Sequence, residues 1–164
     1  MALHIIVDGY NLIGSENGLR GNLENRRKRL LEQLQRYHEK KDYPITVVFD
    51  GWRSGWIYEM EEKVGDLTVI FSRQREKADD VVQRLARELG DACVVVTSDR
   101  ELRMAVEASG ATAIYAREFE RKLRGIGDID ARPEWDRTPT AQKRGNPKKL
   151  PKGERKRREK LGRL

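Results

Sequence analysis

Five short apolar runs rich in β-branched residues recur along the chain, and inside each run the apolar residues are continuous rather than alternating. Strands that are buried on both faces of a sheet show this pattern, because helices cover both sides of a parallel sheet. We therefore predict strands over these runs, which are Leu3–Val7, Ile45–Phe49, Leu67–Phe71, Cys93–Thr97 and Thr112–Tyr115.

Between these runs the apolar residues recur every three to four positions, which is the spacing of one helix face. The predicted helices are Asn22–Lys41, Ala78–Leu89, Glu101–Ala108 and Ala116–Leu123. Strands that alternate with helices indicate an α/β fold, with a central, mainly parallel sheet of about five strands covered on both faces. The aromatic segment 51–66 fits neither pattern, and we expect an irregular or partly helical excursion there.

The length of 164 residues suits one α/β domain with a tail. After Arg124 the strand and helix pattern stops, and prolines and lysines dominate a composition that cannot build a core. We therefore expect one domain over residues 1–125, an extended arm over 126–137 and a basic, disordered tail over 138–164. Within that tail the sequence allows a short helix at Gly153–Leu161.

The positive charge is concentrated in this tail. Residues 138–164 hold eleven Lys or Arg and two Glu, whereas the whole chain carries a formal net charge of +7, so residues 1–137 are slightly acidic. Such a tail attracts polyanions, and nucleic acid is the commonest polyanion inside cells. The alternative interpretation is a solubilising end that binds nothing.

The single cysteine, Cys93, excludes a disulfide framework and suits a reducing, cytoplasmic setting. The N-terminal sequence lacks the basic and long apolar regions of a signal peptide, and no apolar stretch is long enough to span a bilayer. We therefore expect neither secretion nor membrane insertion.

Acidic residues follow the predicted strands at their carboxyl ends. Asp8 follows the first strand, Asp50 the second and Asp99 the fourth, while Asp79 and Asp80 open the helix after the third. In parallel α/β sheets these ends share one edge, where ligands bind. Each acid alone has a structural explanation in a turn or a helix cap. Together, however, several carboxylates on one edge repel one another unless a cation intervenes, which predicts a Mg²⁺ or Mn²⁺ site.

Other catalytic sites are poorly supported. Neither His4 nor His38 has a ligand-like spacing to the cysteine, which argues against zinc. The chain lacks the Gly-x-Ser-x-Gly elbow of serine hydrolases, so Ser98 is expected to orient a carboxylate or a water. The glycine-rich motifs that bind nucleotide phosphates are also missing.

Residues near this edge suit a nucleic-acid substrate. The amide of Asn11 can hydrogen-bond a carboxylate, a water or a phosphate. Tyr10, Trp52 and Trp56 either stack on unpaired bases or pack against the sheet. Cations close to the acids in sequence either contact phosphates or neutralise those acids. These cations are Arg53, Arg73, Arg75, Lys77 and Arg100.

Four motifs occur in a fixed order, namely IIVDGYNLI at Ile5–Ile13, VVFDG at Val47–Gly51, FS followed by KADD within Phe71–Asp80, and VTSD at Val96–Asp99. Over about residues 3–125 this series resembles the NYN family of PIN-like nucleases, in particular its bacterial YacP-like branch, which includes a ribosome-associated endoribonuclease. The resemblance implies a PIN-like three-layer α/β/α sandwich. It also implies Mg²⁺- or Mn²⁺-dependent hydrolysis of RNA phosphodiester bonds on or near ribosomes.

Carried over position by position, the resemblance places Asp8, Asp50, Asp79 and Asp99 in the metal site as catalytic residues, with Asp80 and Asn11 beside them. RNA as the substrate rests on this resemblance. The first alternative is a catalytically inactive module that binds RNA or the ribosome and whose acids are structural.

A small-molecule phosphohydrolase on a doubly wound fold is the second alternative. Phosphatases with an aspartyl nucleophile usually carry a second Asp two residues later, and here that residue is Tyr10. A response-regulator receiver is disfavoured because its paired acids follow an early strand, whereas Asp79 and Asp80 open a later helix.

Overall fold

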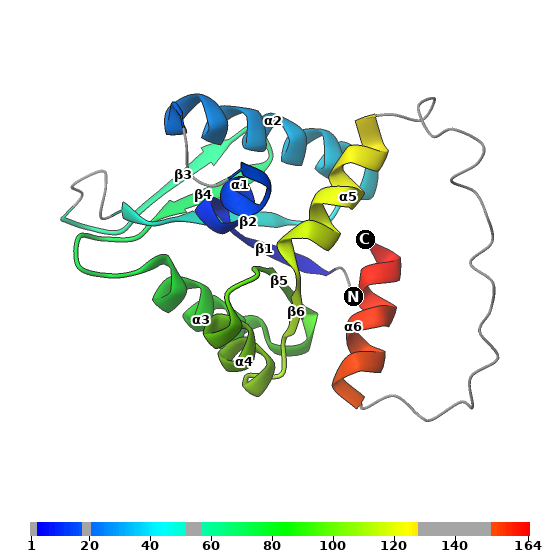
Figure 1. Ribbon diagram of the computed structural model, residues 1–164. Coiled ribbons are helices and arrows are strands. Elements are labelled where there is room, and N and C mark those ends of the chain that lie inside the picture. Colours follow the sequence, from blue (N-terminus) through cyan, green and yellow to red (C-terminus); the bar gives the residue numbers. More distant parts are fainter. Residues whose placement is uncertain (1–2, 18–20, 52–56, 128–151) are drawn as a thin grey trace.

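The computed structural model describes residues 3–17, 21–51, 57–127 and 152–164. A six-stranded sheet forms its centre, in the order β3-β4-β2-β1-β5-β6 (Figure 1). The edge strand β3 runs antiparallel to β4, and the remaining neighbours are parallel. The strands are β1 His4–Asp8, β2 Ile45–Phe49, β3 Met60–Val64, β4 Leu67–Phe71, β5 Cys93–Val96 and β6 Thr112–Ile114.

Helices cover both faces of this sheet. One face carries α1 Gly9–Asn17, α2 Leu23–Lys41 and α5 Ala116–Gly127, and the other carries α3 Ala78–Leu89 and α4 Arg100–Ala108 (Figure 1). The architecture is the predicted α/β/α sandwich of the PIN-like kind. Within the described ranges, no helix is both long enough and apolar enough to cross a membrane.

Two hydrophobic cores explain the continuous apolar runs. Because side chains alternate along a strand, Val7 packs into the core under α1, α2 and α5, while Ile6 packs into the core under α3 and α4. Val47 and Val48 divide in the same way. Most positions of these strands are fully buried and the others are partly buried, and the five predicted strands are confirmed.

The segment 51–66 differs from its prediction. It contains β3, which pairs with β4 through a turn at Gly65 and Asp66. Gly65 has a φ of +61°, a conformation that glycine adopts without strain. All five β3 residues are exposed, because β3 is the outermost strand, so its polar sequence lacks the apolar signature of a buried strand. Residues 52–56 of this segment lie outside the described ranges.

A helix also begins where the sequence pattern indicated a turn. The residues after Asp8 form α1, which starts at Gly9 and buries Leu12 and Ile13 in the core. A Cβ at Gly9 would lie 2.3 Å from the Phe49 ring, so close packing requires glycine there. This requirement, rather than a turn, accounts for the Asp8-Gly9 sequence.

The prediction of a disordered tail over 138–164 is wrong for its last part. Residues Lys152–Arg163 form α6, which lies beside β6 and includes the short helix that the sequence allowed (Figure 1). The helix is anchored by Leu164, whose side chain is 2% exposed, and whose carbonyl oxygen accepts a 2.9 Å hydrogen bond from the Tyr37 hydroxyl. Helix α5 extends to Gly127, into the predicted arm, and residues 128–151 lie outside the described ranges.

Several basic side chains of α6 are paired with the domain rather than directed at solvent. Arg157 Nη1 lies 2.8 Å from both carboxylate oxygens of Glu118, and Lys156 Nζ lies 2.5 Å from Asp91 Oδ1. Lys160 is buried and donates to the carbonyl oxygen of Asp91. Composition alone concealed this docking, because charges that are paired in the fold look in the sequence like a solvated run.

Candidate active site

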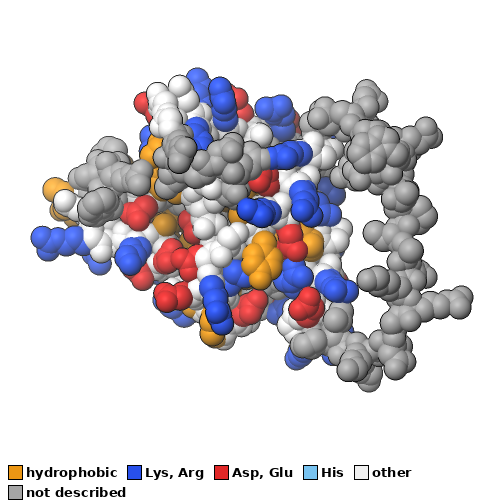
Figure 2. All heavy atoms as spheres, in the orientation of Figure 1, with side chains coloured by type: hydrophobic (Ala, Val, Ile, Leu, Met, Phe, Trp, Pro, Cys, Tyr) orange, Lys and Arg blue, Asp and Glu red, His pale blue; other side chains and the backbone are white. Residues whose placement is uncertain are grey.

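Four aspartates reach the carboxyl edge of the sheet from four different elements. Asp8 ends β1, Asp50 directly follows β2, Asp79 lies in the first turn of α3 and Asp99 is the N-cap of α4. Their charges act on one another, since Asp79 and Asp99 both raise the pKa of Asp8, and Asp50 contributes to raising that of Asp79. The structure therefore brings these carboxylates to one site. Figure 2 shows acidic side chains gathered near α3, with Lys and Arg side chains around them.

Asp8 is the most deeply buried of these acids, with 7% of its surface exposed. Burial raises its pKa to about 7, and the neighbouring charges of Asp79 and Asp99 act in the same direction. The hydroxyl of Thr97 opposes this shift by donating a 3.1 Å hydrogen bond to Asp8 Oδ2. The carboxylate is therefore held in a fixed place but is expensive to ionise in the absence of a cation.

The acids at the helix starts serve two purposes. Burial raises the pKa of Asp79, and the charges of Asp99, Asp80 and Asp50 add to that increase. Asp99 Oδ1 caps α4 by accepting the Leu102 N–H at 3.1 Å. Asp80 is exposed, and its Oδ2 lies 3.4 Å from the backbone N–H of Lys77 at the start of α3. Asp80 and Asp99 therefore interact with backbone N–H groups at helix starts, and their charges also raise the pKa of Asp79.

The donor set at this edge is carboxylate oxygen, which suits Mg²⁺ or Mn²⁺ rather than zinc. In the part of the chain that the structure describes, no three His, Cys, Asp or Glu side chains converge closely enough to form a ready metal cage. Mg²⁺ commonly uses one or two carboxylates and completes its coordination with water and phosphate oxygens. The residues present therefore fit a hydrated ion held by Asp8 and an acidic neighbour.

The two histidines do not contribute to this site. His4 Nε2 lies 2.8 Å from Thr46 Oγ1, near the amino ends of β1 and β2 and away from the aspartates. His38 Nδ1 lies 2.8 Å from the carbonyl oxygen of Tyr43. Burial lowers the pKa of His4, with a smaller contribution from the charge of Lys63. Both rings have structural partners.

Asn11 and Ser98 connect α1, the end of β5 and the start of α5 at this edge. The Asn11 side-chain oxygen accepts the backbone N–H of Ser98 at 2.8 Å. The Ser98 hydroxyl oxygen in turn accepts the backbone N–H of Ala116 at 3.1 Å, which joins the end of β5 to the start of α5. The exposed Ser98 therefore lies between the aspartates and α5, where a substrate can reach it.

A close backbone contact positions Asp50. The N–H of Gly51 donates to Ser72 Oγ at 2.9 Å, and the N–H of Ser72 donates to the carbonyl oxygen of Phe49 at 3.0 Å. A Cβ at Gly51 would lie 1.5 Å from the Ser72 carbonyl oxygen. Any larger residue would displace the loop that carries Asp50.

The predicted phosphate-binding cations fall into two groups. Arg73, Arg75, Lys77 and Arg100 are exposed near the carboxyl edge, and Arg73 Nε lies 3.4 Å from Glu76 Oε2. Arg53 lies outside the described ranges, as do Trp52 and Trp56. The exposed cations are free to approach a polyanion, with Arg73 partly engaged by its acidic neighbour.

Tyr10 packs against the sheet. Its ring centroid lies 5.1 Å from that of Phe49, and its hydroxyl accepts a 2.8 Å hydrogen bond from Arg27 Nη1. A base could stack on Tyr10 only after these neighbours had moved. This arrangement matches the packing alternative considered for Tyr10.

Sequence reasoning did not select Thr97 or Arg103 as site residues. Thr97 is fully buried, and its hydroxyl oxygen also accepts the Asp99 N–H at 3.2 Å, so it links two of the acids. Arg103 is 9% exposed and donates to the Thr97 carbonyl oxygen at 3.3 Å. The sequence offered one signal for Thr97, which is a polar residue at the end of an otherwise apolar run.

Comparison with known proteins agrees with this fold. The family described as the YacP-like NYN domain matches residues 5–163. The chain is 30% identical over 131 residues to the uncharacterised protein YacP of Bacillus subtilis (strain 168), covering 74% of this chain and 75% of that protein. Among solved structures, it is similar to Rae1 (YacP) from Bacillus subtilis, with a TM-score of 0.63, 29% identity and coverage of 77% and 76% of the two chains. A mutant of that protein gives a TM-score of 0.65 at 29% identity, over 76% and 77% of the two chains.

Proposed function

The chain belongs to the family of YacP-like NYN domains, a nuclease-type domain, and from this premise we propose that it is a Mg²⁺- or Mn²⁺-dependent endoribonuclease. It hydrolyses RNA phosphodiester bonds and leaves a 5′-phosphate and a 3′-hydroxyl. The observation that carries the proposal is the burial of Asp8 beside Asp79 and Asp99 at the edge of the sheet where ligands of α/β proteins bind.

In this proposal Asp8 and Asp79 would hold the ion, and Asp99 and Asp50 would complete its acidic surroundings. The ion supplies Lewis acidity that activates water and offsets the charge developing on the phosphate. Thr97 holds the Asp8 carboxylate in place through its hydroxyl. Ser98, fixed by Asn11, presents its side chain to the substrate beside the acids.

The substrate and the setting belong to the same proposal. Single-stranded RNA or mRNA, engaged at the ribosome in the cytoplasm, is the substrate expected of this family. The exposed cations Arg73, Arg75, Lys77 and Arg100 support a polyanionic substrate, because they surround acids that would otherwise repel it.

The test is to incubate the full chain with 5′-labelled single-stranded RNA and Mn²⁺, with and without EDTA. Asp8→Asn and Asp79→Asn are expected to abolish cleavage. Asp42→Asn is the matched control, because Asp42 lies at the end of α2, near the amino edge of the sheet, in a left-handed conformation (φ 57°) that Asn also adopts. Cleavage that survives both site substitutions and EDTA would refute the proposal. Metal-independent binding without cleavage would favour the inactive binding module instead.

A further inference from the structure

A hollow of about 640 Å³ opens directly beside the aspartates. Asn11 and Ser98 line the side next to the acids, and Tyr115, Arg117 and Arg121 line the side formed by β6 and α5. Ser98 lies between Thr97, which bonds Asp8, and Asp99, which caps α4. An RNA strand whose scissile phosphate lies at the aspartates would therefore place its next nucleotide in this hollow.

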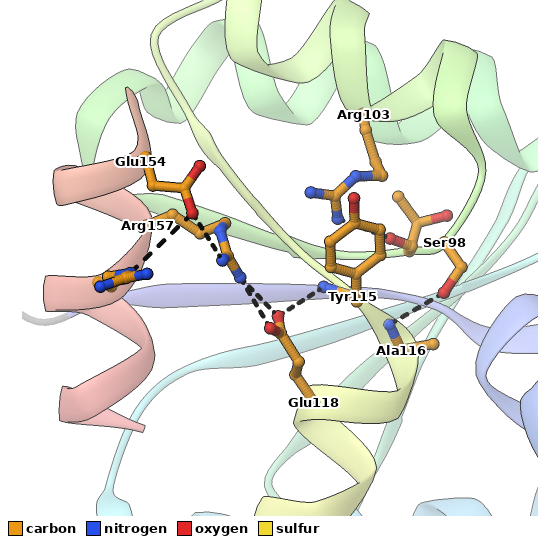
Figure 3. A network of polar contacts seen from close by, with 9 residues as sticks. Ser98, Arg103, Tyr115, Ala116, Glu118, Glu154 and Arg157 are labelled. Carbon is orange, nitrogen blue, oxygen red and sulfur yellow. Dashed lines mark hydrogen bonds and ion pairs between the residues drawn. The ribbon is translucent and has the colours of Figure 1, made fainter. Parts of the chain in front are cut away.

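Tyr115 is an exposed aromatic side chain with a fixed position. Its side chain is 45% exposed, yet the Arg103 guanidinium lies 3.5 Å from its ring centroid (Figure 3). Arg103 is itself held by the Thr97 carbonyl oxygen. A cation stacked on an aromatic ring fixes the ring without covering both of its faces.

Tyr115 borders two hollows with different linings. Tyr115 lines the hollow beside Ser98 and also a second hollow, which Arg103 and Arg157 line. Arg103 and Arg157 do not line the first hollow. Tyr115 therefore borders both hollows, and Arg103 and Arg157, which lie 3.5 Å and 5.9 Å from its ring centroid, line the hollow that does not include Asn11 and Ser98.

The negative charge of the acidic residue in this hollow is neutralised by an arginine of α6. Glu118 also lines it, but both of its carboxylate oxygens lie 2.8 Å from Arg157 Nη1 of α6 (Figure 3). Glu118 Oε2 further accepts the Tyr115 N–H at 3.4 Å. With Glu118 paired, the exposed Arg117 and Arg121 leave the hollow with a net positive charge that suits a phosphate.

We propose that this hollow binds the nucleotide adjacent to the scissile phosphate, with its unpaired base stacked on Tyr115 and its phosphate against Arg117 and Arg121. The inference rests on the proposed RNA-cleaving function and specifies its substrate as a single strand. A base within a duplex already stacks on its neighbours and cannot reach the ring, whereas an unpaired base can.

The stacking contact is tested by binding, in EDTA, a short single-stranded RNA that carries one 2-aminopurine, whose fluorescence is quenched when it stacks. Tyr115→Leu is expected to weaken binding roughly tenfold and to abolish the quenching, because stacking is the main contact of a base in such a site. Tyr115→Phe retains the ring and should retain both signals. Tyr58→Leu is the matched control, since Tyr58 is also exposed but lies next to β3, at the opposite edge of the sheet.

The phosphate contact has a separate test in the salt dependence of binding. The double variant Arg117→Gln, Arg121→Gln should lower the slope of log affinity against log salt by about 0.7 for each phosphate that the protein no longer neutralises. Arg87→Gln, in the last turn of α3, should leave the slope unchanged. Because these arginines are exposed, this test stands even if Tyr115→Leu fails to fold.

Failure of this inference is distinguishable from failure of the proposed function. If the wild-type chain cleaves RNA with Mn²⁺ but Tyr115→Leu binds and quenches like wild type, the stacking site is overturned and the nuclease stands. If no cleavage occurs but quenching depends on Tyr115, the nucleotide site stands without the nuclease. A fully paired duplex that binds as tightly as the single strand would also overturn the inference.

Discussion

The hydroxyl of Thr97 donates a 3.1 Å hydrogen bond to Oδ2 of Asp8, joining residues 89 positions apart in the sequence. Thr97 directly follows β5, the strand that pairs with β1, so the sheet itself brings the two together. The same hydroxyl oxygen accepts the N–H of Asp99. One buried side chain therefore holds two of the four acids.

Replacing Thr97 with Val should destabilise the protein by about 1–3 kcal/mol, because the buried Asp8 carboxylate and the Asp99 N–H would each lose a hydrogen bond. It should also raise the pKa of Asp8 further and weaken Mn²⁺ binding, since the hydroxyl favours the ionised carboxylate. Urea unfolding and Mn²⁺ titration measure these effects. Thr112→Val is the matched control. The buried Thr112 hydroxyl has no hydrogen-bond partner within the described residues, so its removal should be neutral or stabilising.

Asp8→Asn should be more stable than wild type at pH 8 in EDTA, by roughly 2–4 kcal/mol. The pKa of Asp8 is about 7 in the fold and 3.8 in the unfolded chain, so wild type loses stability as the pH rises from about 4 through 7. The difference between the two proteins should therefore shrink toward pH 4. Thermal unfolding at pH 5 and pH 8 measures it. Mg²⁺ should increase the stability of wild type but not that of the variant. Equal stability of the two proteins at pH 8 in EDTA would contradict the raised pKa of Asp8.

Gly51→Ala should destabilise the fold by at least about 2 kcal/mol, because the added methyl group meets the Ser72 carbonyl oxygen. RNA cleavage should fall by roughly a hundredfold, since the displaced loop carries Asp50. Gly162→Ala is the control, because nothing lies within 4 Å of a Cβ there and alanine favours the α6 helix by up to about 1 kcal/mol. Unfolding and cleavage assays of both variants separate steric conflict from a general effect of replacing glycine.

Leu164→Ala should destabilise the protein by roughly 2–4 kcal/mol, and Tyr37→Phe by about 1 kcal/mol, because together these residues anchor α6 to the core. Arg158→Ala, at an exposed position of the same helix, should have little effect. Urea unfolding midpoints measure all three. Equal stability of Leu164→Ala and wild type would mean that α6 does not pack as described.

The five buried strands could be predicted from the sequence because burial on both faces leaves continuous apolar runs. Most helices could be predicted because their apolar residues recur every three to four positions. The helix Ala78–Leu89 agrees with its prediction to the residue. Helix α1 could not be predicted, because Gly9 is required by contact with Phe49, a residue 40 positions away. The strand β3 lacks the apolar signal because all five of its residues are exposed.

The residues of the candidate site also fall into two groups, those that the local sequence indicates and those whose roles only the fold reveals. The four aspartates could be selected because each stands next to a strand end or helix start in the sequence itself. The parts played by Thr97, Arg103 and Tyr115 depend on contacts between distant segments. The docking of α6 depends on a bond across 127 positions, from Tyr37 to Leu164, which no local composition reveals.

The position of α6 beside β6 also bears on aggregation. An edge strand presents unpaired backbone groups that recruit strands from other molecules. Here α6 lies against β6 at one edge of the sheet, and β3 carries the charged sequence Glu61-Glu62-Lys63 at the other. Both features disfavour pairing of these edge strands with a strand of another molecule. A change that detaches α6 would therefore do more than weaken the fold, because it would uncover a strand able to seed fibres between molecules.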